Sequence, residues 1–263
     1  MQDFFEINRG LPQTLEPSPI LDVLKKFDTT IAYASPENLQ QSLPKSGFKV
    51  RSADPTVYET TPGFEKIKDS ENIISTETDP AVIFIHGASF CALMLAKDNH
   101  GNAVGLHQPI EFREGRFHSM KQAVLKLRKF FTGVKTVIGD NEGLLILSGA
   151  NPMLEKDDTQ ARLEALVEKQ NKQTKLSILK LFVKPKESSY ALHRQRMSPL
   201  KDFTDKLSAF SRKKQVLPDD LREINGLIYV PRQIDISGKD RIFVKDKKID
   251  FLDIKGFLFP NLV

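Results

Sequence analysis

Three short apolar runs follow one another closely in the middle of the chain, and they constrain its fold more than any other feature. They occupy residues 81–85, 91–96 and 103–107. Asp79-Pro80 precedes the first run, and the polar stretch 98–102 separates the second run from the third. Runs of this length between turn residues are typical of buried strands, and Asp, Asn and Gly favour tight turns. We therefore expect the order strand, strand, turn, strand.

The segments after these strands predict further helices and strands. Ser119 can cap a helix, and apolar residues after it recur with helical spacing at Met120, Ala123, Val124, Leu127, Phe130 and Phe131. The opposite face carries Lys121, Lys126, Arg128 and Lys129. Residues 134–138, 144–147 and 176–183 are predicted strands, and residues 157–172 a second helix. The pattern indicates an α/β fold, which we expect to be a layered β-sandwich core flanked by helices.

The chain is predicted to divide into three segments. Residues 1–75 form an N-terminal extension with one docked helix, which Ser18 caps and in which Pro19 lies in the first turn. Residues 35–61 within it are expected to be irregular. Residues 76–186 form the core. Residues 187–263 add a helix from Ser198 and short strands that pack on or extend the core, at 227–230, 241–244 and 249–252.

Charge is distributed unevenly along the chain. Residues 1–80 hold 8 Lys and Arg against 13 Asp and Glu, and the remainder holds 31 against 21, of 39 and 34 in all. A basic body fits an acidic partner surface, although such residues also serve as a solvated face. No motif of a nucleic-acid-binding module is present, so nucleic acid is not an expected partner.

The chain has one cysteine, which excludes an intramolecular disulfide and a zinc site built on cysteines. The N-terminus lacks the basic and apolar regions of a signal peptide. No apolar stretch approaches the roughly 18 residues of a membrane-spanning helix. We therefore expect a soluble protein without a transmembrane segment, either cytoplasmic or secreted into another cell without a cleaved N-terminal signal.

The lone cysteine has a histidine at a spacing that permits chemistry. Cys91 opens one expected strand and His107 ends the next, so a tight turn brings both to the same end of an antiparallel pair. Cysteine attacks as a thiolate, and a neighbouring histidine accepts its proton. Backbone N–H groups around Cys91 can then stabilise an oxyanion. Both residues are candidate catalytic groups; a buried structural thiol and a structural core histidine are the alternative interpretations.

These residues resemble the motif of a known family. Ser89-Phe90-Cys91, the following strand and turn, and Val104-Gly105-Leu106-His107 are similar to the Gly-Ser-Cys turn, strand, polar turn and Gly-Gly-Leu-x-His of CheD-type chemoreceptor glutamine deamidases. The serine two residues before the cysteine also matches the Leu-Ser-Gly-Cys of the catalytic domain of cytotoxic necrotizing factor. Downstream, Ser148-Gly149-Ala150 resembles the Gly-Gly-Ala turn of CheD-type proteins. The resemblance covers residues 82–183.

The resemblance implies the layered deamidase fold and a cysteine-dependent hydrolysis of a side-chain amide on a protein substrate, through a thioester. Cys91 would be the nucleophile, His107 the acid and base, and Ser89 either a further site residue or a hydroxyl that stabilises the turn. No metal or other cofactor is implied. Phe90 replaces the toxin's glycine, and Ile85 replaces the threonine that orients the histidine in CheD-type enzymes, so the third member of the site is unassigned.

Three functions remain open on the sequence. The first is an enzyme, a protein glutamine deamidase with transglutaminase-like chemistry and an effector or toxin role. The second is a non-catalytic protein-binding module on the same fold, which the departures at Ile85 and Phe90 favour. The third is a cysteine hydrolase of different bond specificity.

Overall fold

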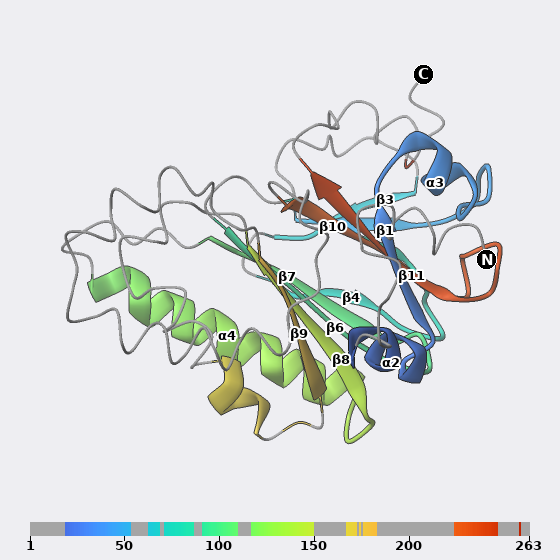
Figure 1. Ribbon diagram of the computed structural model, residues 1–263. Helices are drawn as coiled ribbons and strands as arrows, with labels where there is room; N and C mark the ends of the chain where they lie inside the picture. Colours follow the sequence, from blue (N-terminus) through green and yellow to red (C-terminus); the bar gives the residue numbers. More distant parts are fainter. Residues whose placement is uncertain are drawn as a thin grey trace, which may run out of the picture.

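The computed structural model describes residues 19–53, 63–68, 71–86, 91–109, 117–149, 167–172, 174, 176–182, 224–246 and 258. Within them the chain is a mixed α/β structure with two mixed β-sheets and few helices (Figure 1). The helices with assigned bounds are α2 (Pro19–Lys26), α3 (Pro36–Gln40) and α4 (Phe117–Val137).

The strands fall into a six-stranded and a five-stranded sheet in the described part of the chain. The first sheet contains β1 (Thr29–Tyr33), β2 (Val50–Ser52), β3 (Phe64–Lys66), β5 (Val82–His86), β10 (Ile224–Val230) and β11 (Asp240–Asp246), in the order β1-β11-β10-β5-β2-β3. The second contains β4 (Ile73–Ser75), β6 (Cys91–Asp98), β7 (Ala103–Pro109), β8 (Gly143–Gly149) and β9 (Leu176–Phe182), in the order β4-β7-β6-β8-β9. Each sheet mixes parallel and antiparallel neighbours.

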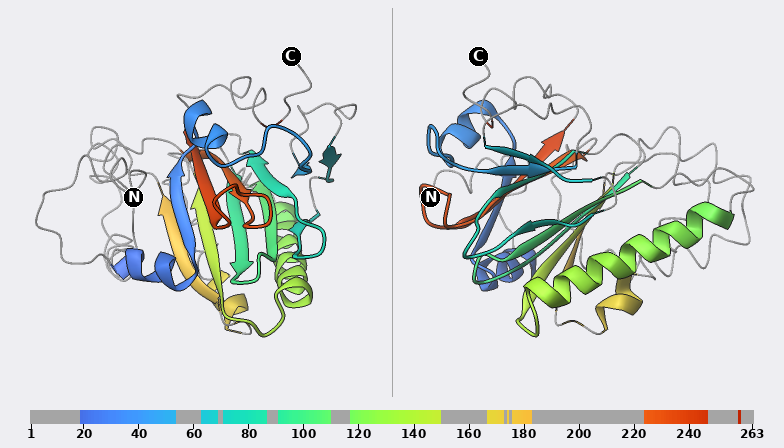
Figure 2. Two further views of the ribbon diagram at one scale, coloured as in Figure 1. Left: turned by 90° about the vertical axis from the view of Figure 1, so that its right-hand side faces the viewer. Right: turned by 180° about the vertical axis from the view of Figure 1, so that it is seen from behind.

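The two sheets pack face to face, and α4 covers the outer face of the five-stranded sheet (Figure 2). Strand β6 shows the layers, because its side chains alternate between faces with a period of two. Leu93 and Leu95 enter the apolar layer between the sheets, whereas Met94 enters the layer beneath α4. A third apolar layer, which includes Leu39 of α3, lies on the outer face of the six-stranded sheet. This layered α/β arrangement is the one the sequence predicts at the level of fold class.

Helix α4 is longer than predicted and includes residues 134–137, so the strand predicted at 134–138 is wrong. One face of the helix buries Leu127, Phe130, Phe131 and Val134, and Ile138, directly after its end, is buried in the same layer. A short apolar run does not distinguish a strand from a buried helix by periodicity alone, and here the helical spacing simply continues through it.

Residues 35–61 were expected to be irregular, yet the described part of this stretch contains α3 and β2. Ser35 caps α3, since its hydroxyl accepts a hydrogen bond from the backbone N–H of Asn38 at 3.2 Å, and Pro36 occupies the first turn. β2 has only three residues and pairs in parallel with β3 and β5. A strand of three residues is too short to show a period of two. Because its pairing partners also lie elsewhere in the chain, the local sequence did not predict it.

The other expected strands within the described residues are confirmed, with ends that differ by a few residues, and so is the helix at Pro19–Lys26. The helix expected at 157–172 is described only from residue 167, and the helix from Ser198 and the strand at 249–252 lie outside the described residues. The sequence did not predict β1, which pairs in parallel with β11. The division into three segments stays a prediction.

A buried ion pair connects the two sheets at one end of β6. The Lys97 ammonium lies 2.6 Å from the Asp240 carboxylate of β11, and both side chains are fully buried. Lys97 Nζ also donates to the Phe27 carbonyl at 2.8 Å and to the Thr29 hydroxyl at 2.6 Å. Burial lowers the pKa of the Lys97 ammonium, and the negative charge of Asp240 opposes that effect. All three ammonium protons therefore have acceptors in the protein.

Asp240 has further donors around it. The Tyr229 hydroxyl donates to it at 3.3 Å, and Arg232 donates through its backbone N–H at 2.8 Å and its guanidinium at 3.1 Å. Burial of a charge is tolerated when hydrogen bonds satisfy it in this way. The network therefore fixes the start of β11 against β6.

A second polar contact joins the sheets at their other edge. Arg51 of β2 donates to the Ile74 carbonyl of β4 at 2.7 Å and to the Glu65 carboxylate of β3 at 2.6 Å. It also pairs with Asp79, which lies in the turn between β4 and β5. Hydrogen bonds from Lys49 and then Arg51 lower the pKa of Asp79 to about 2. This turn is where the chain crosses from one sheet to the other.

Replacing Lys97 by methionine is expected to lower the free energy of unfolding by about 3 kcal/mol, because removing one partner of a buried pair leaves the other charge without compensation. Because Arg232 remains beside Asp240 and partly compensates its charge, we expect the loss in free energy of unfolding to lie at the lower end of the range for broken buried ion pairs. Urea denaturation measures the difference. The matched control is Lys45→Met, at an exposed lysine. A loss for Lys97→Met no larger than that of the control would refute a structural role for the pair.

The lowered pKa of Asp79 predicts a specific pH dependence of stability. A carboxyl group with a folded-state pKa below its unfolded value stabilises the fold above about pH 4, and the contribution is lost as the pH falls through about 2. Wild type should therefore exceed Asp79→Asn in thermal stability at neutral pH, and the difference should narrow across that acid window. Thermal unfolding at several pH values measures it, with Glu77→Gln in the same turn as the control. A stability difference between wild type and Asp79→Asn that does not change with pH would contradict the lowered pKa of Asp79.

Candidate functional site

The antiparallel pair of β6 and β7 positions the two candidate catalytic residues. Cys91 is paired with Pro109, and Leu93 is paired with His107. Positions 91 and 107 are thus diagonal neighbours that belong to the same face of the sheet. Diagonal positions lie about 7–8 Å apart, a gap that a long or aromatic side chain can span. The backbone therefore places the cysteine and histidine positions together, as the spacing predicts.

The turn between the two strands fixes this register. The buried Asp98 carboxylate accepts hydrogen bonds from the backbone N–H groups of His100 and Asn102, at 2.8 and 3.0 Å, and from the Asn102 side chain at 2.9 Å. Gly101 adopts a φ of 87°, which favours glycine. A slip of one residue would move every side chain of β6 to the other face. The turn thus determines which face positions 91 and 107 share.

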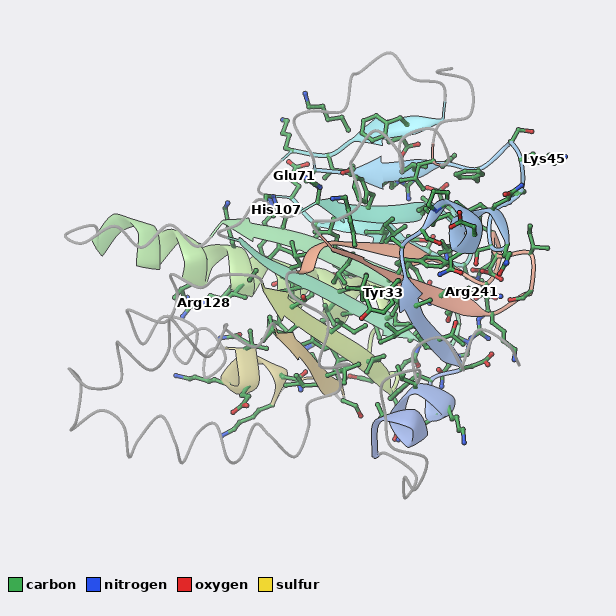
Figure 3. All side chains as sticks on the ribbon, turned by 45° about the horizontal axis from the view of Figure 1, so that its top comes forward. Tyr33, Lys45, Glu71, His107, Arg128 and Arg241 are labelled. Atoms are coloured by element: carbon green, nitrogen blue, oxygen red, sulfur yellow. The ribbon has the colours of Figure 1, made fainter. Side chains whose placement is uncertain are left out.

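That face is the one between the two sheets. Leu93, the residue opposite His107, is buried in the layer between the sheets. Gly105 lies two residues before His107, and a Cβ at that position would meet the Ile83 side chain at 2.9 Å and the Ile85 side chain at 3.0 Å. The facing sheet thus approaches β7 so closely that any larger residue there would force the Ile83 or Ile85 side chain to shift. His107 is only partly buried and lies at the end of this closely packed region (Figure 3).

Ser89 lies in the stretch 87–90, outside the described residues, and for Cys91 the description is limited to its backbone. The assignment of both as site residues, and of His107 as their partner, therefore stays a prediction. Ile85 faces the layer between the sheets, close to β7. Its hydrocarbon side chain cannot orient an imidazole by hydrogen bonding. His86 lies on the opposite face of the same strand, with its ring 5.9 Å from that of Phe84.

The structure places one further polar residue on this face, which the sequence indicated only as part of the turn motif at 148–150 and not as a site residue. Ser148 of β8 is paired with Leu93, so it is the diagonal neighbour of position 91 on the side away from His107. It is fully buried, and its hydroxyl has no hydrogen-bond partner within the described residues. Its place beside position 91 could not be predicted from the sequence, because it depends on the pairing of β6 with β8.

The described ranges contain no cluster of three or more His, Cys, Asp or Glu side chains able to hold a metal ion. No helix in those ranges is long and apolar enough to cross a membrane. No protein-family model matches the chain, and no curated protein matches it at a significant level.

Ser148 and Ser75 form a matched pair for testing whether the Ser148 hydroxyl stabilises the fold or is left without a hydrogen bond in it. Both are fully buried, but Ser75 accepts a hydrogen bond from the Ala81 backbone N–H at 3.0 Å. An unsatisfied buried hydroxyl is costly, whereas a satisfied one stabilises. Ser148→Ala should therefore raise the free energy of unfolding by about 1 kcal/mol, and Ser75→Ala should lower it by about 1 kcal/mol. Urea denaturation of both variants measures this, and equal losses would show that Ser148 is a structural hydroxyl.

Proposed function

We propose that the chain is a cysteine-dependent amidohydrolase that deamidates glutamine side chains of a protein, on a fold of the CheD-type and cytotoxic-necrotizing-factor kind. The register that makes positions 91 and 107 diagonal neighbours on one face supports this proposal most directly. The layered α/β architecture is compatible with it. The motif around Ser89, Cys91 and His107 supplies the resemblance from which the reaction class is taken.

The proposed reaction has two halves. His107 accepts the thiol proton of Cys91, and the thiolate sulfur bonds to the amide carbon of the glutamine. The tetrahedral intermediate collapses as its C–N bond breaks, and His107 returns the proton to the leaving ammonia. Water, activated by His107, then attacks the thioester carbon and releases glutamate and the free thiol. An amine in place of water gives the transglutaminase-like outcome.

The neighbours of position 91 on β7 and β8 suggest separate roles in the proposed reaction. An imidazole can span the diagonal gap to a cysteine, but the short side chain of Ser148 on the other side cannot. The Ser148 hydroxyl, which has no partner within the described residues, would donate to the oxyanion, together with backbone N–H groups.

A specific feature of α4 favours a protein as the partner, and it also supports the alternative of a non-catalytic binding module. The helix contains no acidic residue. Arg128, Lys129 and Lys135 are exposed on it, and they form no ion pair with other described residues. Leu125, on the same exposed face, retains 52% of its accessible surface. A basic face around an exposed leucine fits an acidic protein surface. The enzyme and the binding module differ only in what Cys91 does to the bound partner.

Ammonia release tests the proposal. The probes are a blocked glutaminyl-glycine dipeptide and an unfolded, glutamine-rich protein such as casein. Wild type should release ammonia and convert glutamine to glutamate without cutting the chain. Cys91→Ala and His107→Ala should each lower the rate by about 100-fold or more, because they remove the nucleophile and the proton acceptor. Mass spectrometry of intact casein distinguishes deamidation from cleavage.

Equal ammonia release by wild type and Cys91→Ala would contradict the proposal. Cleavage of casein that depends on Cys91 would favour a cysteine hydrolase of another bond specificity. Binding of casein without any Cys91-dependent change of mass would favour the binding module. Lys45→Ala, at an exposed lysine outside α4, serves as a control that leaves both the proposed catalytic residues and the basic face of α4 intact.

A further inference from the structure

The solvent face of α4 carries one continuous stripe of exposed side chains, and the helix has no acidic residue. The exposed residues recur three, four or seven positions apart and are Leu125, Arg128, Lys129, Thr132, Lys135 and Thr136. The two threonine hydroxyls donate to the backbone carbonyls of Arg128 and Thr132, each at 2.9 Å. The helix itself therefore satisfies the hydroxyls, and the cations and Leu125 remain for a partner.

A neighbouring helical segment adds positive charge beside this stripe. Val167 is fully buried in the apolar layer beneath α4, which places residues 167–171 next to that helix (Figure 2). Lys169 and Lys172 of this segment are exposed, and Glu168 between α4 and these lysines in sequence is already engaged in another interaction. Among the described residues, no carboxylate forms an ion pair with a cation of the α4 stripe or with these two lysines. Their charges therefore add to one positive field.

The stripe passes close to the level of the proposed site. Asn72, directly before β4, donates to the Lys129 carbonyl at 3.1 Å. The next residue, Ile73, is paired with Gly105 of β7, two residues before His107. Because a helix rises about 1.5 Å per residue, Leu125 and Lys135 lie about 6 and 9 Å from Lys129 along the axis, in opposite directions. A protein bound along the stripe therefore lies near the histidine end of β7.

We propose that the α4 stripe is an exosite that binds an acidic segment of the substrate protein, so that the chain selects glutamines of acidic proteins. The reaction in this inference rests on the proposed function, whereas the binding does not. Arg128, Lys129 and Lys135 attract carboxylates, and Leu125, with 52% of its surface accessible, offers an apolar contact among them. An apolar contact surrounded by charges complementary to the partner is typical of protein interfaces.

The composition of the stripe favours a protein over the other anionic partners. Single-stranded nucleic acid is held by exposed aromatic side chains on which bases stack, but Phe130 and Phe131 of α4 are buried. A helix that lies on a membrane inserts its apolar face into the lipid, but the apolar face of α4 packs on the five-stranded sheet. Leu125 is then its exposed large apolar residue among those described.

Binding of a fluorescein-labelled peptide rich in glutamate and leucine, followed by fluorescence anisotropy, tests the exosite without requiring activity. Lys129→Glu/Lys135→Glu should raise the Kd by about 10-fold or more, because attraction becomes repulsion. The matched control Lys45→Glu/Lys239→Glu makes the same change of net charge at exposed lysines on other elements and should raise it by less than about threefold. Higher salt should weaken wild-type binding and narrow the difference. Circular dichroism verifies that both variants are folded.

Ammonia release then shows whether the exosite serves the proposed reaction. Lys129→Glu/Lys135→Glu should raise the KM for casein, an acidic protein, by about 10-fold, and should leave the rate with the blocked glutaminyl-glycine dipeptide unchanged, because the dipeptide is too small to reach the stripe. A kcat that falls equally with both substrates would place the effect in the reaction itself and would overturn the exosite.

The remaining outcomes separate this inference from the proposed function. Equal peptide affinity in wild type and Lys129→Glu/Lys135→Glu, or an equal loss in the control, overturns the exosite. Tighter binding of phosphatidylserine vesicles or of single-stranded RNA than of the peptide, lost in the same variant, overturns an acidic protein as the partner. Peptide binding that depends on α4, together with no ammonia release by wild type, keeps the docking surface and sinks only the deamidase proposal.

Discussion

The buried ion pair between Lys97 and Asp240 is the interaction on which the arrangement of this fold most depends. It joins the central region of the five-stranded sheet to the start of β11, and through the Thr29 hydroxyl it also holds the start of β1. Two buried charges are stabilising only when their geometry and remaining hydrogen bonds are satisfied. Here the ammonium has three acceptors, and the carboxylate has Tyr229 and Arg232 as further donors. The network therefore requires both sheets to be in place.

This ion pair holds the two sheets together at one end of β6, and the proposed site lies at the other end. At the closed end the turn after Asp98 is also tied to the loop after β10, since Gln233 donates to the His100 carbonyl at 3.0 Å. Moving along β6, Leu95 and Leu93 fill the layer between the sheets. Beyond them lie position 91 and its neighbours on β7 and β8. A strand held rigidly at one end by charge and in its middle by packing can present a reactive residue at its other end with a fixed orientation.

Local sequence signals predicted the β6–β7 hairpin and most of the longer strands, but they did not predict which strands distant in the sequence become neighbours. The turn at 98–102 and the apolar runs beside it specify β6 and β7, because the residues that pair are close in sequence. β1 pairs in parallel with β11, and no local pattern announces such a distant partner. The same limit applies to the site. Cys91 and His107 belong to one hairpin, so the closeness of their positions in the sheet was predictable, whereas the place of Ser148 beside position 91 depends on the pairing of β6 with the more distant β8. The strand wrongly expected at 134–138 reflects the ambiguity of short apolar runs.

The proposed function requires that the His107 imidazole act on the Cys91 thiol, and one measurement tests this requirement most directly. The chain has a single cysteine, so alkylation by iodoacetamide followed by mass spectrometry reports on Cys91 alone. The rate is measured as a function of pH in wild type and in His107→Ala. We predict that wild type reacts as a thiolate already near pH 6, and that His107→Ala needs a pH of about 8.5, the range of an ordinary thiol. A single ionisation near pH 8.5 or above in both proteins would contradict it.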